Sequence, residues 1–251
     1  MYLMFNPVEL AEWTRGMVCE KDRRKYYRFR PSRFYGGIST ADSVGCCLRC
    51  VFCWSWNIMK DPGRYGKFHS PEEVAGILTS IARKKKLGHL RISGNEPTIH
   101  RAHLIRVLES IKMEYPFILE TNGVLIGKDP TYAVELSKFP NLYVRVSLKG
   151  TCEEEFSRLT GANPEGFALQ LQALENLRQN EVKVHPACMI SFSPPEKVKA
   201  LRKRLRTIDP TFEDFEVEEL ILYPPVKERL RTLNIKYLSA YKPQNLPEEQ
   251  V

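Results

Sequence analysis

Three cysteines lie close enough together in the sequence to hold one soft metal centre. They are Cys46, Cys50 and Cys53, with the spacing C-x3-C-x2-C. Thiolates select zinc, copper(I) and iron–sulfur clusters. Three thiolates are one too few to ligate every iron of a four-iron, four-sulfur cluster, so one iron would stay open. The spacing therefore predicts an iron–sulfur cluster with one iron available to bind a ligand.

Two other interpretations of the cysteines remain open. A structural zinc site needs four ligands, usually two C-x2-C pairs or a Cys/His set, but Cys19, Cys152 and Cys188 are isolated and no histidine lies near the loop. Disulfide scaffolds are typical of small secreted domains, whereas this chain has 251 residues and seven cysteines, four of them clustered. We interpret the fourth clustered cysteine, Cys47, as a bystander because it breaks the spacing.

The residues around the cysteines resemble the radical S-adenosylmethionine (radical SAM) family. Phe52 directly precedes Cys53, and the run Ser-Gly-Asn-Glu-Pro follows at residues 93–97. The family carries C-x3-C-x-aromatic-C and, later, a Gly-Gly-Glu-Pro-like segment. The resemblance implies a [4Fe-4S] cluster on the three cysteines and S-adenosylmethionine bound at its open iron. Reductive cleavage would give a 5′-deoxyadenosyl radical that abstracts hydrogen from a substrate, with a flavodoxin-like or ferredoxin-like protein as reductant.

Strand and helix patterns alternate along the chain. Apolar runs predict strands over residues 38–44, 89–93, 117–120, 142–148, 182–190 and 217–222. Helical periodicity predicts helices over 71–86, which would stop at Gly88, and over 102–113, 132–138, 166–180 and 196–206. Such alternation implies βαβ units and a parallel sheet, hence an α/β fold. The resemblance implies a partial (β/α)6 TIM-like barrel of parallel strands.

Each polar motif follows a predicted strand. The cysteine loop follows the first strand, the 93–97 run the second, Thr-Asn-Gly at 121–123 the third, and Ser-Leu-Lys-Gly at 147–150 ends the fourth. In a parallel barrel these positions share one rim, so the active site is expected at the C-terminal strand ends. The predicted domains are a basic, helical N-terminal extension over 1–37, the barrel over 38–223 and a C-terminal extension over 224–251.

The predicted ligand contacts follow from these motifs. Gly94 would let backbone approach the ligand, Glu96 would accept from its ammonium group, and Asn95, which replaces the second family glycine, tolerates left-handed backbone. Asn122 offers a donor and an acceptor, although Thr-Asn-Gly alone is commonly only a turn. The resemblance implies that Ser147 and Lys149 contact ribose hydroxyls or the carboxylate of the cofactor. Phe52 would offer an apolar face to adenine. The full predicted cofactor-binding set is Phe52, Ser93, Gly94, Asn95, Glu96, Pro97, Asn122, Ser147, Lys149 and His185.

His185 is the weakest member of that set. It lies in the predicted fifth strand and would line the cofactor site from there. A single histidine in an apolar strand is more often a packed core residue. Both interpretations stay open from the sequence.

The chain carries a net charge of +8, with basic runs at 21–33, 83–86 and 197–206. Such runs could attract RNA or an acidic protein, or simply face solvent.

No run of about 18 apolar residues is present, so we expect no membrane span. With the clustered cysteines, this predicts a reducing, cytoplasmic location.

Within the family, the layout is similar to the activating enzymes of glycyl-radical proteins, which abstract hydrogen from a partner's glycine. Those enzymes tend to carry aspartate at the positions of Glu120 and Ser147, and this chain departs from them there. A radical SAM enzyme that modifies tRNA, another RNA or a peptide is the alternative. From a different class, a non-catalytic iron–sulfur or zinc protein that binds RNA would also fit the cysteines and the charge.

Overall fold

The computed structural model describes residues 4–245, and one open sheet forms its centre. The strand order is β1-β2-β3-β5-β6-β7-β8-β9, with β4 paired to β2. The pairs from β3 to β9 along this path are parallel, whereas those of β1, β2 and β4 are antiparallel. The strands are β1 Cys19–Glu20, β2 Arg23–Ser32, β3 Ile38–Ser43, β4 Lys67–His69, β5 His89–Gly94, β6 Phe117–Thr121, β7 Leu142–Leu148, β8 Lys183–Met189 and β9 Glu216–Glu218.

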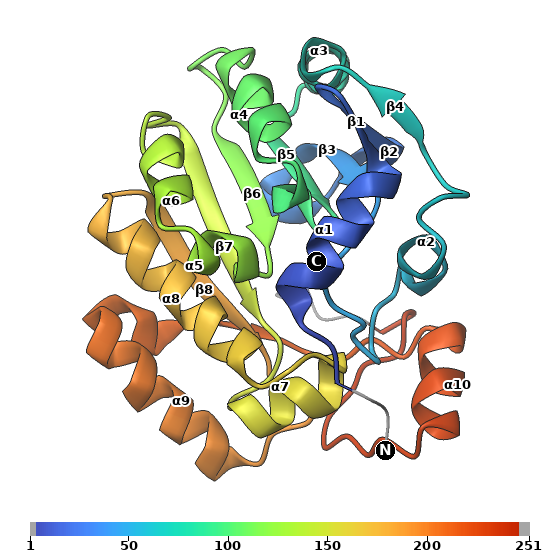
Figure 1. The fold of residues 1–251 in the computed structure, drawn as a ribbon, viewed down its shortest axis with the longest axis vertical. Coiled ribbons are helices and arrows are strands. Elements are labelled where there is room, and N and C mark those ends of the chain that lie inside the picture. Colours follow the sequence, from blue (N-terminus) through green and yellow to red (C-terminus); the bar gives the residue numbers. More distant parts are fainter. Residues whose placement is uncertain (1–3, 246–251) are drawn as a thin grey trace.

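Helices cover the outside of this sheet. Figure 1 shows α3, α4, α6, α8 and α9 following one another around it, with α10 apart from that row. The α-helices are α1 Pro7–Val18, α2 Trp56–Lys60, α3 Pro71–Lys85, α4 Arg101–Glu109, α5 Val124–Lys128, α6 Thr131–Leu136, α7 Glu153–Thr160, α8 Glu165–Gln179, α9 Pro195–Ile208 and α10 Pro224–Thr232. Short 3-10 helices are η1 Phe34–Gly36, η2 Pro97–Ile99 and η3 Pro210–Asp214.

The two faces of the sheet differ in polarity. Along β7, Val144, Val146 and Leu148 belong to the main apolar core, while the alternate residues Arg145 and Ser147 point to the opposite face. Helices therefore pack on one face, as in a β/α barrel, and the other face carries charged and hydroxyl groups. This face, called the inner face below, is where polar chemistry can take place.

The predicted parallel sheet of alternating β and α elements is confirmed, and the sheet is not closed. Several boundaries differ from the predictions. Helix α3 ends before Gly88 because Lys86 adopts a left-handed conformation, with φ 53°. Helix α4 ends at Glu109 rather than at residue 113, and β9 covers Glu216–Glu218 rather than 217–222.

The prediction of a helical N-terminal extension is wrong beyond Val18. The basic run forms β2, which pairs antiparallel with β3 and so extends the sheet. Its charges suit a strand because Arg28 and Arg30 both reach Asp42 of β3, at 2.6 and 3.0 Å. The outer parts of the two predicted extensions, residues 1–3 and 246–251, lie outside the described residues.

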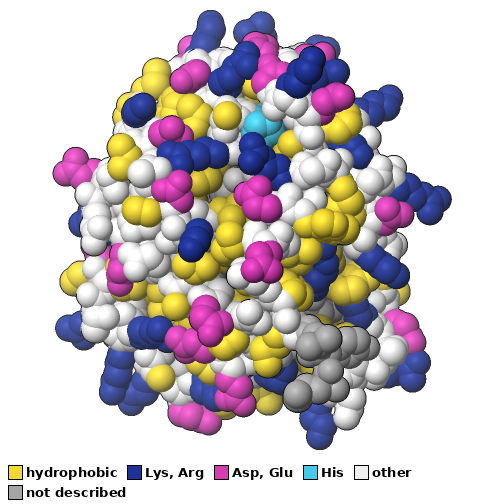
Figure 2. Space-filling model, viewed as in Figure 1, with side chains coloured by type: hydrophobic (Ala, Val, Ile, Leu, Met, Phe, Trp, Pro, Cys, Tyr) yellow, Lys and Arg dark blue, Asp and Glu magenta, His cyan; other side chains and the backbone are white. Residues whose placement is uncertain are grey.

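The basic run of α9 is largely matched by acidic neighbours. Lys197, Arg204 and Arg206 pair with Glu154, Glu153 and Glu213. Figure 2 shows Lys and Arg side chains standing among Asp and Glu side chains over most of the visible face. Across residues 4–245, no helix is long and apolar enough to cross a bilayer.

The contact between α5 and α8 yields a prediction about stability. A Cβ at Gly127 would lie 1.8 Å from the Leu169 carbonyl oxygen, so Gly127→Ala must push two packed helices apart. We expect a loss of about 1–3 kcal/mol in the free energy of unfolding, measured by urea titration. Gly76→Ala in α3 is the matched control, because its Cβ meets nothing within 4 Å. The control should gain about 0.4–1 kcal/mol. Equal stability of the two variants would contradict the packing described here.

Candidate metal centre

The cysteine loop leaves the end of β3 and is fastened at both ends by one side chain. The Asn95 side-chain oxygen accepts from the Gly45 backbone N–H at 2.9 Å, and its amide nitrogen donates to the Ser55 hydroxyl at 2.7 Å. Ser55 Oγ lies 3.5 Å from Cys53 Sγ. Asn95 therefore closes the loop that carries the three cysteines. From the sequence, an asparagine here is explained by its tolerance of a left-handed backbone, but Asn95 is not among the residues with positive φ.

The left-handed residue of this segment is Gly94, with φ 96°. A Cβ there would lie 2.6 Å from the Ser43 backbone nitrogen. Only glycine lets the end of β5 approach the end of β3 so closely. The close approach brings the 93–97 segment against the start of the cysteine loop.

Glu96 connects the loops after three strands. Its backbone N–H donates to the Gly45 carbonyl at 2.9 Å. Its fully buried carboxylate accepts from the hydroxyl groups of Thr98 and Thr121, at 2.7 and 2.6 Å, and from the backbone N–H groups of Thr98 and Asn122, at 3.1 and 2.8 Å. Protein donors thus reach both oxygens of this carboxylate, so Glu96 joins the loops of the site. The expected contact with a ligand's ammonium group stays a prediction.

Asn122 is directed at the cysteines. Its side-chain nitrogen lies 3.2 Å from Cys47 Sγ and 3.9 Å from Cys46 Sγ. Its side-chain oxygen accepts from the Val124 backbone N–H at 3.0 Å, which fixes the orientation of the amide. Cys47 is fully buried in the main core. Asn122 thus lies beside Cys46 and Cys47, and its expected contact with the cofactor stays a prediction.

Ser147 and Lys149 share an acidic partner that the sequence did not reveal. Ser147 donates to the Glu218 carboxylate of β9 at 2.7 Å, and Arg145 donates to the same carboxylate at 2.7 Å. The Lys149 ammonium group lies 3.7 Å from the Glu218 carboxylate and also bonds to Ser147. Burial opposes ionisation of Glu218, but Lys149 and Arg145 outweigh it and lower its pKa to about 2. A carboxylate from β9 therefore faces Ser147, on the strand that ends beside the site.

A second ion pair lies further into the inner face. Arg91 donates to Glu120 at 2.8 Å, and Ser93 bonds to the other oxygen of the same carboxylate. Tyr35, from the turn between β2 and β3, donates to Glu120 at 3.3 Å, and the Phe34 ring lies 4.9 Å from the Arg91 guanidinium. Ser93 is thus engaged within the protein, and the β2–β3 turn covers this part of the inner face.

The remaining predicted residues fall in different places. His185 is half exposed, bonds to Glu216 at 3.1 Å and lies beside Arg145 in the first half of β8. This position is away from the strand ends that carry the cysteines, and the expected contact of His185 with the cofactor stays a prediction. Phe52 packs on Phe192, with 5.5 Å between ring centroids. Pro97 is buried as the first residue of η2.

Two arginines that the sequence does not assign to the site bind the loop from its two sides. Arg24 of β2, almost fully buried, donates to the carbonyls of Val44 at 3.0 Å and Glu96 at 2.7 Å. Arg229 of α10 donates to the carbonyls of Val51 and Cys53, both at 2.6 Å. Neither contact has a local sequence signal, because each partner is a main-chain oxygen.

The loop offers three thiols as metal donors. In the described residues, no three His, Cys, Asp or Glu side chains lie close enough together to hold one metal ion. A [4Fe-4S] cluster ligated by three cysteines takes one thiolate on each of three irons and leaves the fourth iron open. A side-chain hydrogen bond from Cys47 lowers the pKa of Cys46, while burial raises the pKa of Cys50 and Cys53. Three thiols on one loop therefore match an iron–sulfur cluster.

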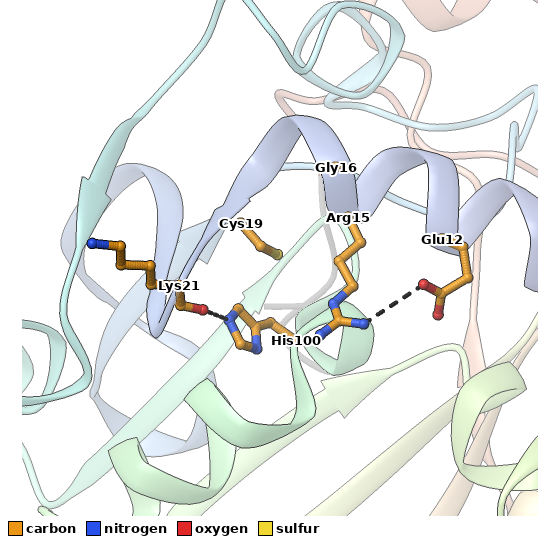
Figure 3. Close-up of a pocket in the computed structure, with 6 residues that line it drawn as sticks. All are labelled: Glu12, Arg15, Gly16, Cys19, Lys21 and His100. Atoms are coloured by element: carbon orange, nitrogen blue, oxygen red, sulfur yellow. Dashed lines mark hydrogen bonds and ion pairs between the residues drawn. The ribbon is translucent and has the colours of Figure 1, made fainter.

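A surface hollow of about 460 Å³ lies elsewhere, between α1 and the start of α4. Its lining includes Arg15, Cys19, Lys21 and His100 but none of the predicted site residues. Figure 3 shows His100 turned to the Lys21 carbonyl and Arg15 turned to Glu12. The hollow is therefore separate from the cysteine loop.

The bonds of Glu96 give a prediction about the folded state. Glu96→Gln replaces an acceptor with an amide group that meets N–H and O–H donors, so we expect a loss of about 1–3 kcal/mol in the free energy of unfolding. Urea titration of the metal-free protein measures it. Glu73→Gln in the exposed capping box of α3 is the control, with an expected change within about 0.5 kcal/mol. A Glu96→Gln protein as stable as the control would contradict the role of Glu96.

The low pKa of Glu218 gives a prediction about acid stability. Because folding lowers this pKa from its ordinary 4.5 to about 2, the ionised carboxylate stabilises the fold above pH 4.5, and this contribution is lost as the pH falls towards 2. The urea midpoint should fall less between about pH 5 and about pH 2.5 in Glu218→Gln than in the original protein. An equal fall in both proteins would show that Glu218 does not carry this ion pair.

Comparison with known proteins identifies the family. The Radical SAM superfamily model matches residues 41–206, more than half of the chain. A probable GTP 3′,8-cyclase of Pyrobaculum aerophilum is 28% identical over 134 residues, which is 53% of this chain and 41% of that protein. The chain thus spans well under two thirds of that relative.

Solved structures share the fold. Streptococcus suis SuiB bound to the precursor peptide SuiA matches with a TM-score of 0.61 at 19% identity, over 78% of this chain and 44% of SuiB. TYW1 with a bound lysine–pyruvate adduct matches with a TM-score of 0.51 at 15% identity, over 88% of this chain and 76% of TYW1. With the family match, these findings show that the chain belongs to the Radical SAM superfamily, whose members use a [4Fe-4S] cluster and S-adenosylmethionine.

Proposed function

We propose that this protein is a radical SAM enzyme whose cluster is held by Cys46, Cys50 and Cys53. The observation that carries the proposal is the convergence of the motifs. The loops after β3, β5 and β6 are joined through Glu96, and Asn122 points at the cysteine sulfurs. When bound, the cluster and S-adenosylmethionine supply a 5′-deoxyadenosyl radical that removes hydrogen from a substrate.

The chain's own residues would bind and orient the cofactor. Lys149, a buried ammonium group whose electrostatic neighbours include Cys50 and Cys46, can receive a carboxylate. Asn122 can offer an amide donor next to Cys46, and Ser147 with Glu218 can accept from hydroxyl groups. Phe52, supported by Phe192, offers an apolar surface beside the last cysteine and helps to exclude water.

The inner face favours a polar substrate. Arginines and carboxylates line it in ion pairs such as Arg91 with Glu120 and Arg145 with Glu216. The basic runs at 21–33 and 197–206 give little support to RNA binding, because Arg24 and Lys25 are buried against main-chain carbonyls and residues of α9 pair with acids. We therefore favour hydrogen abstraction from a peptide or protein, as in the activating enzymes of glycyl-radical proteins. A flavodoxin-like or ferredoxin-like protein would supply the electron.

Cleavage of S-adenosylmethionine tests the proposal. The protein is reconstituted anaerobically with iron and sulfide, reduced with dithionite and mixed with S-adenosylmethionine, and 5′-deoxyadenosine is measured by chromatography. The unaltered protein should form it. Single alanine variants at Cys46, Cys50 and Cys53 should abolish it, because each removes a ligand of the cluster.

Cys152→Ala is the matched control, because Cys152 precedes α7 and bonds to no residue of the cysteine loop. It should retain full activity. Continued formation of 5′-deoxyadenosine in a triple Cys46/Cys50/Cys53→Ala protein would refute the assignment of the ligands.

A further inference from the structure

Arg229 makes an unusual pair of contacts with the cysteine loop. Its guanidinium group donates from Nε to the Val51 carbonyl and from Nη2 to the Cys53 carbonyl, both at 2.6 Å. These carbonyls lie on either side of Phe52. A planar guanidinium can grip two acceptors at once, so it fixes the last turn of the loop.

The rest of α10 holds Arg229 in place. Val226 and Leu230 of the same helix pack with Val51 and Phe192 in a second apolar core. The guanidinium carbon lies 4.4 Å from the centre of the Trp56 ring, at the start of α2. Apolar packing and the aromatic contact therefore bring a single cation to the cysteine loop from the C-terminal part of the chain.

Among the described residues, Arg229 has no acidic partner, since no carboxylate of residues 4–245 lies at ion-pair distance from it. Burial lowers the pKa of Arg229, and the charges of Cys53 and Cys50 oppose that effect. An uncompensated, partly buried cation interacts most strongly with whatever negative charge lies near it.

We propose that Arg229 is a positioning residue that raises the reduction potential of the cluster held by Cys46, Cys50 and Cys53. One-electron reduction makes a cluster more negative, so a fixed neighbouring cation stabilises the reduced form more than the oxidised form. Net charge and hydrogen bonding around a cluster are established controls of its potential. The inference rests on the proposed function, because it requires that cluster.

The test is the midpoint potential of the cluster in the full-length reconstituted protein, followed by electron paramagnetic resonance without S-adenosylmethionine. In Arg229→Gln the ratio of reduced to oxidised cluster at a fixed applied potential should fall tenfold, a shift of about 60 mV to more negative values. Arg231→Gln is the control, because Arg231 lies in the same helix but is exposed and pairs with Glu228 at 2.6 Å. It should leave the midpoint unchanged.

Arg229→Lys separates charge from structure. Lysine keeps the positive charge but loses the two-pronged grip, so its midpoint should stay closer to the original than that of Arg229→Gln. If Arg229→Gln fails to hold iron, a midpoint near the original in Arg229→Lys supports the inference.

Equal shifts in both variants, failure of both to hold iron, or no shift in a fully loaded Arg229→Gln protein would overturn it. An unaltered protein that holds no cluster would instead overturn the ligand assignment itself, and the inference with it.

Discussion

The site depends on one buried residue, Glu96, whose main chain and side chain join the loops after three neighbouring strands. Its N–H reaches the loop after β3, and its carboxylate receives four donors from its own loop and from the end of β6. A buried carboxylate without donors would be costly, so these contacts fix one arrangement of the three loops. Because the cysteines lie on the first of these loops, their positions follow from this constraint.

The segments outside the barrel strands also take part in the site. Arg24 from the N-terminal side binds the carbonyls of Val44 and Glu96, and Arg229 from the C-terminal side binds those of Val51 and Cys53. Arg24 also lies 3.6 Å from Cys19 Sγ, and among the described residues neither arginine forms an ion pair with a carboxylate. The two ends of the chain therefore supply positive charge as well as mechanical support to the cysteine loop, and they are parts of the site rather than appendages.

The sequence predicts the parallel sheet well, because the alternation of strands and helices is a local property of the chain. The cysteine spacing is local too, and the assignment of the cysteines as ligands stays a prediction. Alternating strands and helices force strand ends to one edge, so the cysteine loop, the 93–97 segment and Asn122 could be expected together. Tertiary contacts were not predictable. Glu218 contacts Ser147, which lies 71 residues earlier in the sequence, and Arg229 contacts Val51, which lies 178 residues earlier. The sequence gives no sign that the run around Arg28 is a strand of the sheet, because its counter-charge, Asp42, lies on another strand.

We propose that Cys46, Cys50 and Cys53 hold a cluster whose remaining iron binds S-adenosylmethionine. Mössbauer spectroscopy of protein reconstituted with iron-57 tests this arrangement directly, since it resolves individual iron environments. We expect a [4Fe-4S] spectrum in which one iron changes its isomer shift when S-adenosylmethionine is added, while the other irons do not. A mononuclear iron or zinc-like site, or a cluster whose irons are all unaffected by S-adenosylmethionine, would contradict it.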